Sequence, residues 1–272
     1  MKSAVTISLV PEARGGPFVF HGDLAAGCAK AAALGYDAVE VFPRSLEELD
    51  APLLRRLLKE HHLQLAAVGS GAGWVVHQLR LTDADAVVRR RAQEFISGII
   101  DFAAGFGAPA ILGSMQGRFE GAVTREQALA WLGEAMENLG ERAATAGVPF
   151  LYEFLNRYET NLCHRVGEAL ALVESLRTKN VFLLCDLFHM NIEEASIPDA
   201  LRQAGARIGH VHFVDSNRRA AGLGHLDYGP IAQALRDIGY RGYLSAEALP
   251  FPDAEAAAAQ TIAHYRKYFP AP

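Results

Sequence analysis

The chain has 272 residues, of which 50% are hydrophobic and 21% are charged. This composition is typical of a globular protein with a sizeable core and excludes a disordered chain. The 26 Lys and Arg residues are outnumbered by 31 Asp and Glu residues, which gives a formal net charge of −5. Because no Lys/Arg-rich run occurs either, neither nucleic acid nor an anionic membrane is expected as a partner.

The cysteines and the hydropathy of the chain indicate the cellular compartment in which the protein is expected. The three cysteines, Cys28, Cys163 and Cys185, are an odd number at spacings too wide for a disulfide framework or a zinc knuckle. The first sixteen residues hold too short an apolar run for a signal peptide, and no 18 apolar residues follow one another. We therefore expect a cytoplasmic protein with no membrane-spanning segment.

Two kinds of segment alternate along the chain. Apolar, β-branched runs of strand length lie at residues 4–9, 38–42, 64–68, 110–112, 148–152, 181–185, 208–213 and 242–246. Amphipathic stretches, which predict helices, lie between them at residues 24–34, 46–61, 83–106, 125–146, 166–178, 197–204, 229–238 and 253–269. Many of these helices end in a glycine, such as Gly35 or Gly147, which tolerates the left-handed conformation of a helix C-terminus.

The repeat length predicts the fold class. The apolar runs begin about 34 residues apart on average, the length of one βα unit. Eight such units, with strands apolar throughout as in a parallel sheet buried on both faces, predict an α/β protein with a (β/α)8 TIM barrel. A doubly wound open sheet is the alternative. No linker or break in composition divides the chain, so we expect a single barrel domain over residues 1–272.

Four of the predicted strands end in a residue that can bind a metal or move a proton. These residues are Glu153, Asp186, His212 and Glu247, spaced 33, 26 and 35 residues apart. Active sites of such barrels lie at the C-terminal strand ends, so the four side chains are expected at one mouth. Three carboxylates and one imidazole suit Mn²⁺, Mg²⁺ or Co²⁺ better than structural zinc. Each residue alone is also an ordinary polar strand end, but four in succession favour an open catalytic metal site.

Hydrogen-bonding residues crowd the loops that follow these strands. Glu159, His189 and Arg218 are the main candidates for reading substrate hydroxyls, which need paired partners when they are buried. Arg157 and Glu194 fit a solvent-exposed charge or a local ion pair at least as well.

The first half of the chain offers fewer signals. Arg118, after the fourth strand, fits a contact with a substrate carboxylate or phosphate and a structural salt bridge about equally well. Trp74 is a candidate for the pocket wall, and Phe42 fits the core better. The side chain of His210 points to the same side of the sheet as that of His212 only if their strand is regular. In that case His210 would contact the metal-binding residues without binding the metal itself.

Longer motifs around these residues resemble a known family. The matching stretches are Glu153-x-x-Asn156-Arg157-Tyr158-Glu159, Asp186-x-Phe188-His189-Met190-Asn191-Ile192-Glu193-Glu194, His212-x-x-Asp215-Ser216-Asn217-Arg218 with Gly222-Leu-Gly224-His225, and Glu247. They are similar to those of the divalent-metal sugar isomerases and epimerases with a xylose-isomerase-like barrel, in particular the ketose 3-epimerases. Within these, the D-tagatose/D-psicose and 5-keto-L-gluconate types are the most similar, and weaker likeness extends over the whole chain.

The resemblance implies specific roles. It implies that the four strand-end residues bind one divalent ion, Mn²⁺ first and Mg²⁺ or Co²⁺ as alternatives, and that Glu153 and Glu247 are also the catalytic acid/base pair. It implies that Glu159, His189 and Arg218 contact the sugar near its carbonyl. A homodimer or homotetramer acting on a small sugar or sugar acid is expected. The common ketose epimerases carry Gly-Glu where this chain has Val214-Asp215, which leaves the identity of the sugar open.

The chemistry supports C3 epimerisation as the leading hypothesis. Proton removal beside a ketone builds negative charge on oxygen, which a metal stabilises as an enediolate, and two carboxylates on opposite faces can invert the carbon. An aldose–ketose or hydroxypyruvate-type isomerase with the same site is the alternative. A metal-dependent DNA-repair endonuclease would need more histidines and a basic groove. A catalytically silent sugar-binding barrel would not need both acid/base carboxylates.

Overall fold

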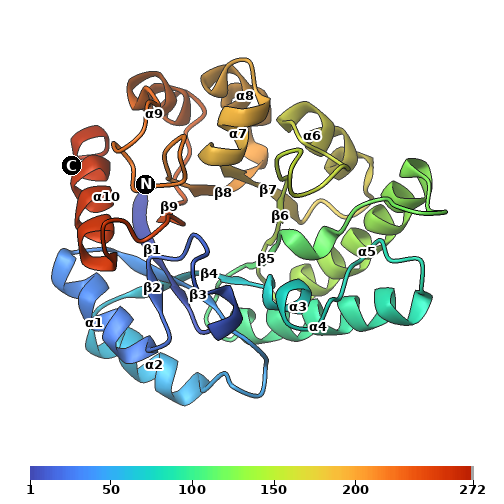
Figure 1. Ribbon diagram of the computed structural model, residues 1–272, viewed down its shortest axis with the longest axis horizontal. Helices are drawn as coiled ribbons and strands as arrows, with labels where there is room; N and C mark the ends of the chain where they lie inside the picture. The colour runs from blue at the N-terminus through green and yellow to red at the C-terminus, as the bar shows by residue number, and fades with distance from the viewer. Residues whose placement is uncertain (271–272) are drawn as a thin grey trace.

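The computed structural model describes residues 1–270, in which strands and helices alternate and the strands close into a barrel (Figure 1). All neighbouring strands are parallel, and the last strand pairs with the first. Around the barrel the order is β1 (Lys2–Ser8), β3 (Ala38–Phe42), β4 (Gln64–Gly69), β5 (Ala110–Leu112), β6 (Phe150–Glu153), β7 (Val181–Asp186), β8 (Ile208–His212) and β9 (Tyr243–Ala246). The predicted TIM barrel is confirmed, and the open-sheet alternative is wrong.

Helices surround the strands on the outside of the barrel (Figure 1). The long ones are α1 (Leu24–Leu34), α2 (Ala51–Glu60), α4 (Ala86–Ala104), α5 (Arg125–Thr145), α6 (Val166–Ser175), α8 (Ile197–Ala204), α9 (Tyr228–Asp237) and α10 (Ala254–Tyr268). No helix within residues 1–270 is long and apolar enough to cross a membrane.

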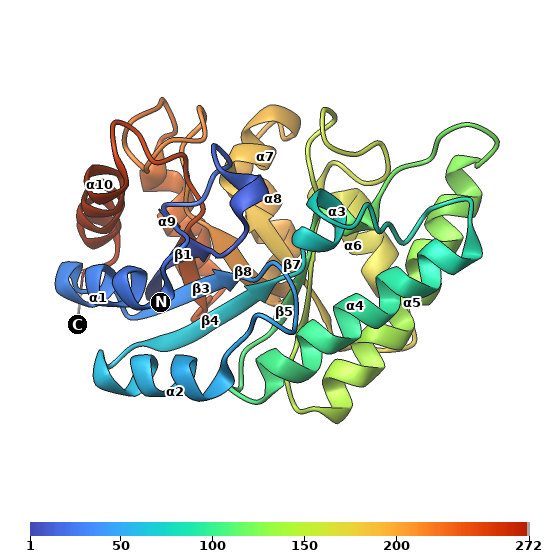
Figure 2. The ribbon, with the colours of Figure 1, turned by 60° about the horizontal axis from the view of Figure 1, so that its bottom comes forward.

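Several short elements were not predicted. They are β2 (Phe20–His21), which pairs with β1, the helices α3 (Ala72–Val75) and α7 (Leu187–Glu193), and 3-10 turns at Pro11–Ala13, Ser114–Gln116 and Gly205–Arg207. The short helices α3 and α7 and several of the loops that follow strands lie in the upper half of Figure 2. The C-terminal strand ends therefore open into one group of loops.

Local capping explains where prediction and structure differ. The helix predicted from residue 46 begins at Ala51, because the side chain of Asp50 accepts a hydrogen bond from the backbone N–H of Leu53 and a proline stands in the first turn. The helix predicted from residue 83 begins at Ala86, where Asp85 has the same capping role. The strand predicted at 148–152 runs from Phe150 to Glu153.

The core has two parts. A large apolar layer lies between the strands and the outer helices. Smaller clusters, made of residues that alternate with it along the strands, fill the barrel interior: Phe42, Ala67, Ile111, Leu151 and Leu184, and separately Ala4, Ala38 and Ala66. A polar side chain that points into the barrel is therefore either fully buried or exposed only at the mouth of the barrel.

Candidate active site and metal centre

The four strand-end residues converge at the mouth of the barrel. Glu153, Asp186 and His212 are the last residues of β6, β7 and β8, and Glu247 directly follows β9. All four are buried, and their ligand atoms lie within 4.8 Å of one another. Nδ1 of His212 lies 3.4 Å from Oε1 of Glu153, from Oδ2 of Asp186 and from Oε2 of Glu247. The imidazole therefore faces three carboxylates at once.

The charges in this cluster match a cation. Burial raises the pKa of Glu153 to about 8, and its Oε1 is buried without a hydrogen-bond partner. Burial alone would lower the pKa of His212, but Glu247, Glu40 and the other carboxylates raise it well above its usual value. Burial likewise opposes ionisation of Asp186, yet neighbouring cationic groups lower its pKa overall. Three hard oxygen donors and one imidazole within ligand range fit Mn²⁺, Mg²⁺ or Co²⁺.

Glu40 is a site residue that the sequence analysis missed. Its carboxylate is fully buried in the middle of β3 and lies 3.1 Å from Nε2 of His212 and 2.7 Å from Nε2 of His210. Burial alone would raise the pKa of Glu40, but the two imidazoles lower it, so the group is ionised. A single glutamate inside the apolar run 38–42 was the available signal. His210 does point with His212 into the barrel, as a regular strand requires.

His189, on α7, presents an N–H to the cluster. The Oδ1 atom of Asn156 accepts from the backbone N–H of Tyr158, so its Nδ2 faces Nδ1 of His189 at 2.6 Å. The His189 Nδ1 atom must then accept, which assigns the proton to Nε2. This Nε2 atom has no hydrogen-bond partner and lies 3.8 Å from Oε1 of Glu153. Burial lowers the pKa of His189, so the ring is a neutral donor aimed at the cluster.

Arg218 connects the cluster to the rim of the pocket. Its guanidinium donates to Oε1 of Glu159 at 2.9 Å and to Oε2 of Glu247 at 3.2 Å, and it lies over the ring of Phe188. Its backbone has a positive φ of 59°, uncommon for a residue with a side chain. Asp215 supports this conformation because its carboxylate accepts from three backbone N–H groups of the same loop, those of Ser216, Gly222 and Leu226.

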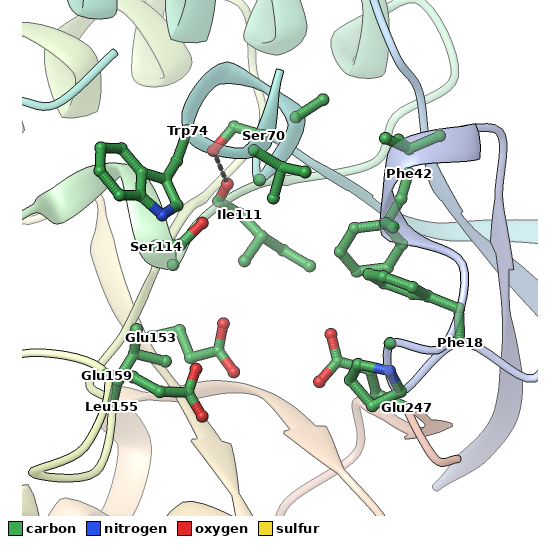
Figure 3. Close-up of a pocket in the computed structure, with 18 of the residues that line it drawn as sticks. Phe18, Phe42, Ser70, Trp74, Ile111, Ser114, Glu153, Leu155, Glu159 and Glu247 are labelled. Atoms are coloured by element: carbon green, nitrogen blue, oxygen red, sulfur yellow. Dashed lines mark hydrogen bonds between the residues drawn. The ribbon is translucent and has the colours of Figure 1, made fainter. Parts of the chain in front are cut away.

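A cavity of about 610 Å³ opens in front of these residues. Figure 3 shows Glu153 and Glu247 pointing toward each other across it, with Phe18 packed against Phe42 on the opposite wall from Trp74. The remaining walls come largely from the first half of the chain, with Val10, Arg14, Ser70, Ile111, Ser114 and Arg118 among the lining residues. The structure therefore places the predicted Trp74 and Arg118 in the pocket. Phe42, expected in the core, lies both in the core and in the lining.

Two predicted loop residues serve the scaffold. Arg157 forms a two-pronged ion pair with Glu193, and Glu194 accepts a hydrogen bond from the backbone N–H of Val166 at the start of α6. These contacts match the ion-pair interpretation for Arg157 and give Glu194 a structural partner.

The fold and the cluster together define a parallel-barrel protein with a candidate divalent-metal centre at the mouth. The chain belongs to the xylose isomerase-like TIM barrel family, whose model matches residues 28–268. The resemblance to the ketose 3-epimerases, enzymes of the isomerase class, is thereby confirmed, since several relatives bear that name.

Three relatives illustrate the similarity. An L-ribulose 3-epimerase of Methylomonas sp. (strain DH-1) is 31% identical over 242 residues, which cover 86% of this chain and 82% of that protein. A D-psicose 3-epimerase of Agrobacterium fabrum is 33% identical over 220 residues, or 78% of this chain and 75% of that one. The crystal structure of a D-allulose 3-epimerase from Methylomonas sp. in complex with D-allulose superposes with a TM-score of 0.82, 26% identity and coverage of 99% and 98% of the two chains.

Proposed function

We propose that this protein is a divalent-metal-dependent epimerase that inverts C3 of a ketose or keto-sugar acid. The observation that carries the proposal is the pair of buried carboxylates, Glu153 and Glu247, which face each other across the cavity while both border the candidate metal centre (Figure 3). Inversion at one carbon needs an acid and a base on opposite faces of that carbon, and this arrangement supplies both.

The two glutamates would act in turn. One carboxylate takes the proton from C3, and the electrons of the broken C–H bond form an enediolate with the neighbouring carbonyl. The other glutamate, in its protonated form, then delivers a proton to the opposite face of C3. Exchange with water resets the two groups, so solvent hydrogen enters the product at C3. The bound cation would stabilise the negative charge that develops on the substrate oxygens.

Three neighbours would bind and orient the sugar. The unpaired Nε2–H of His189 can donate to a substrate oxygen beside the cluster. Arg218 adds a positive charge next to Glu247, and Glu159 accepts from Arg218 and from Asn156 at the rim. These contacts support roles for all three in holding the carbonyl and the adjacent hydroxyl.

Further features of the pocket support a sugar acid within the proposed substrate class. Arg118 lines the cavity, and no carboxylate within residues 1–270 pairs with it, whereas Arg80 nearby is held by Asp83 and Glu120. A free guanidinium suits a substrate carboxylate. The Trp74 ring, which lies under Arg80 at 5.2 Å, would pack against the carbon face of the sugar.

The proposal extends to three finer points. Mn²⁺ is the proposed ion because one imidazole joins three carboxylates. Three buried free cysteines are compatible with the proposed cytoplasmic location. The resemblance to ketose 3-epimerases supports a homodimer or homotetramer, which light scattering coupled to size-exclusion chromatography would measure.

Deuterium exchange tests the proposal. The Mn²⁺-loaded protein is incubated in D₂O with D-fructose, D-tagatose, L-ribulose, 5-keto-gluconate and tagaturonate, and the sugars are analysed by NMR after the protein is removed. We expect deuterium at C3 together with the C3-inverted product, lost on chelation. An aldose or aldehyde product would assign an isomerase instead, and the absence of exchange in all substrates would contradict the proposal.

Substitution of the two glutamates tests the mechanism. Glu153→Gln and Glu247→Gln should each lower kcat by about 10²–10⁴-fold, the usual contribution of a positioned acid or base. Glu137→Gln is the matched control, because Glu137 is also a buried carboxylate, accepting from the backbone N–H groups of Arg177 and Thr178, but on the outer helix α5. Substantial turnover in either site variant would refute the acid/base assignment.

A further inference from the structure

Glu40 reaches His212 across the barrel interior. β3 pairs with β1 and β4, whereas β8 pairs with β7 and β9, so Glu40 and His212 lie on strands that are not neighbours in the sheet. The carboxylate is fully buried, and so is the ring of His212. Strand pairing alone therefore does not explain why a charged side chain stands at this position, where burial without partners is costly.

Both oxygens of Glu40 are used, each by a different histidine. Oε1 lies 3.1 Å from Nε2 of His212, and Oε2 lies 2.7 Å from Nε2 of His210. The two histidines stand two residues apart on β8, which places both side chains on the inward side of the strand. Their rings are perpendicular, with centroids 5.5 Å apart. One carboxylate thus bridges two imidazoles of fixed orientation.

The bridge determines which nitrogen of a neutral His212 carries the proton. An ionised carboxylate only accepts hydrogen bonds, so the Nε2 atom of His212 must donate. The lone pair of a neutral ring then lies on Nδ1, the atom that faces Glu153, Asp186 and Glu247 at 3.4 Å. An imidazole that ligates a metal through one nitrogen commonly donates its other N–H to a carboxylate, which fixes tautomer and ring orientation.

His210 holds the far side of the bridge. Its Nε2 occupies the second oxygen of Glu40, and its Nδ1 is buried without any hydrogen-bond partner in the described structure. Glu40 is therefore the polar partner of the His210 ring. With this contact in place the carboxylate cannot rotate away from His212 without leaving a buried N–H unpaired.

We propose that Glu40 is a positioning residue, anchored by His210, that holds His212 in the Nε2–H tautomer needed to bind the divalent ion. The inference rests on the proposed function only in taking His212 as a metal ligand. Glu40 itself touches neither the cavity nor the ligand cluster on the Nδ1 side, so its effect passes through His212.

Calorimetric titration of the metal-free protein with Mn²⁺ alone provides the first test. In Glu40→Gln an amide offers one oxygen and one NH₂ to two N–H donors, so one imidazole loses its acceptor. The dissociation constant for Mn²⁺ should rise by about 10–100-fold, the usual cost of losing the partner behind a ligand. Glu137→Gln, which makes the same chemical change at a buried carboxylate on the outer helix, should bind as the wild type does.

The titration also separates this inference from the proposed function. A wild-type protein that binds no Mn²⁺ overturns both. Wild-type binding that is unchanged within about threefold in Glu40→Gln overturns this inference alone, since the usual loss is at least about tenfold. A second bound ion in the wild type that disappears in Glu40→Gln would make Glu40 a ligand and overturn its positioning role.

The ring protons of His212 provide a readout that does not depend on folding of Glu40→Gln. Long-range ¹H–¹⁵N spectra of the Mg²⁺-loaded wild-type protein, with His212 assigned from the spectrum of His212→Asn, distinguish the two tautomers. We expect His212 as the Nε2–H form. An Nδ1–H form in the loaded wild type would overturn the inference even if Glu40→Gln did not fold.

Discussion

Gly113 illustrates how closely the backbone approaches the side chain of Glu153, one of the two proposed acid/base residues. A Cβ atom built at this position would lie 2.5 Å from Oε2 of Glu153. The backbone here is also held in place, because the Gln116 amide donates to the backbone carbonyl oxygens of Gly113 and Glu153, while the Tyr152 hydroxyl donates to the Gln116 amide oxygen. The absence of a side chain at Gly113 thus leaves the space in which Glu153 adopts its position.

Gly113→Ala should impair catalysis while the fold is retained. The added methyl group would displace the Glu153 carboxylate, and a shift of about 1 Å at a reacting group can cost about 10²-fold in kcat. Steady-state kinetics and circular dichroism measure the two effects. Gly133→Ala on α5 is the control, because its Cβ would meet only ordinary contacts at 3.8 Å. Unchanged kcat in Gly113→Ala would contradict the close-approach argument.

Arg118 should discriminate between acidic and neutral sugars. Arg118→Gln removes a charge from the pocket wall, so we expect KM to rise by about tenfold for a keto-sugar acid, less than a fully buried charged hydrogen bond would cost, and to stay constant for a neutral ketose. Arg91→Gln, at an exposed position of α4, serves as the control. Equal changes in KM for the acidic and the neutral sugar would show that Arg118 has a structural role and does not bind a substrate carboxylate.

Proton release should accompany metal binding. The raised pKa of Glu153, about 8, means that this carboxyl holds a proton near neutral pH, and His212 with its raised pKa also holds one. A divalent ion competes with these protons, so the Mn²⁺ affinity should increase as the pH rises through about 8, the pKa of Glu153. Calorimetry in buffers of different ionisation enthalpy counts the protons. No release at about pH 7 would contradict this prediction.

At the scale of elements, the loop between β8 and α9 is shaped by one side chain. Asp215 accepts from the backbone N–H groups of Ser216 at 2.8 Å, Gly222 at 2.7 Å and Leu226 at 3.2 Å. These bonds close the loop and hold Arg218 at its positive φ beside Glu247. The conformation of the loop therefore depends on an acceptor-only carboxylate at its base.

Asp215→Asn should therefore reduce activity more than stability. The amide directs an N–H group at a backbone N–H, the loop loosens, and Arg218 is no longer held beside Glu247. We expect kcat/KM to fall by about tenfold or more, which corresponds to about 1.4 kcal/mol. Asp227→Ala, at the N-cap of α9, removes a helix cap instead and should cost about 1 kcal/mol of folding free energy with kcat/KM unchanged. The reverse pattern would refute the assignment.

Elements with a clear hydrophobic period could be predicted from the sequence, and short ones could not. The eight barrel strands and eight long helices were predicted because buried strands and amphipathic helices leave regular patterns. β2 has two residues and α3 has four, too few to show a period. The strand-end rule located Glu153, Asp186, His212 and Glu247. It missed Glu40, because that residue lies mid-strand and its partner His212 is 172 residues away in the chain.

For the whole molecule, closure of the barrel connects the metal centre to global stability. The candidate ligands come from β6, β7 and β8 and from the residue after β9, and β9 completes the ring by pairing with β1. Without a cation, the folded state must hold three carboxyl groups close together. Burial raises the pKa of Glu153 to about 8, so this group is neutral near pH 7 and the repulsion within the cluster is reduced. A bound ion would therefore act on the strands that complete the barrel.

Mn²⁺ should raise the thermal midpoint, and EDTA should reverse the change. An ion that binds only the folded state adds about 2.7 kcal/mol of stability at a free concentration 100 times its dissociation constant. Differential scanning calorimetry with and without Mn²⁺ measures this effect. Asp186→Asn, which removes one proposed ligand, should reduce the shift. A shift of the same size in this variant would place the stabilising ion elsewhere.

The two sides of the pocket come from different halves of the chain, which affects how its substrate preference can change. The proposed acid/base pair and the other candidate metal ligands lie between residues 153 and 247, whereas most of the facing walls come from segments before residue 119. The wall segments before residue 119 can be replaced by loop exchange without altering any candidate ligand of the cluster. A new sugar preference is therefore accessible, in evolution or in the laboratory, through chimaeras that join the N-terminal loops of one relative to the C-terminal half of another.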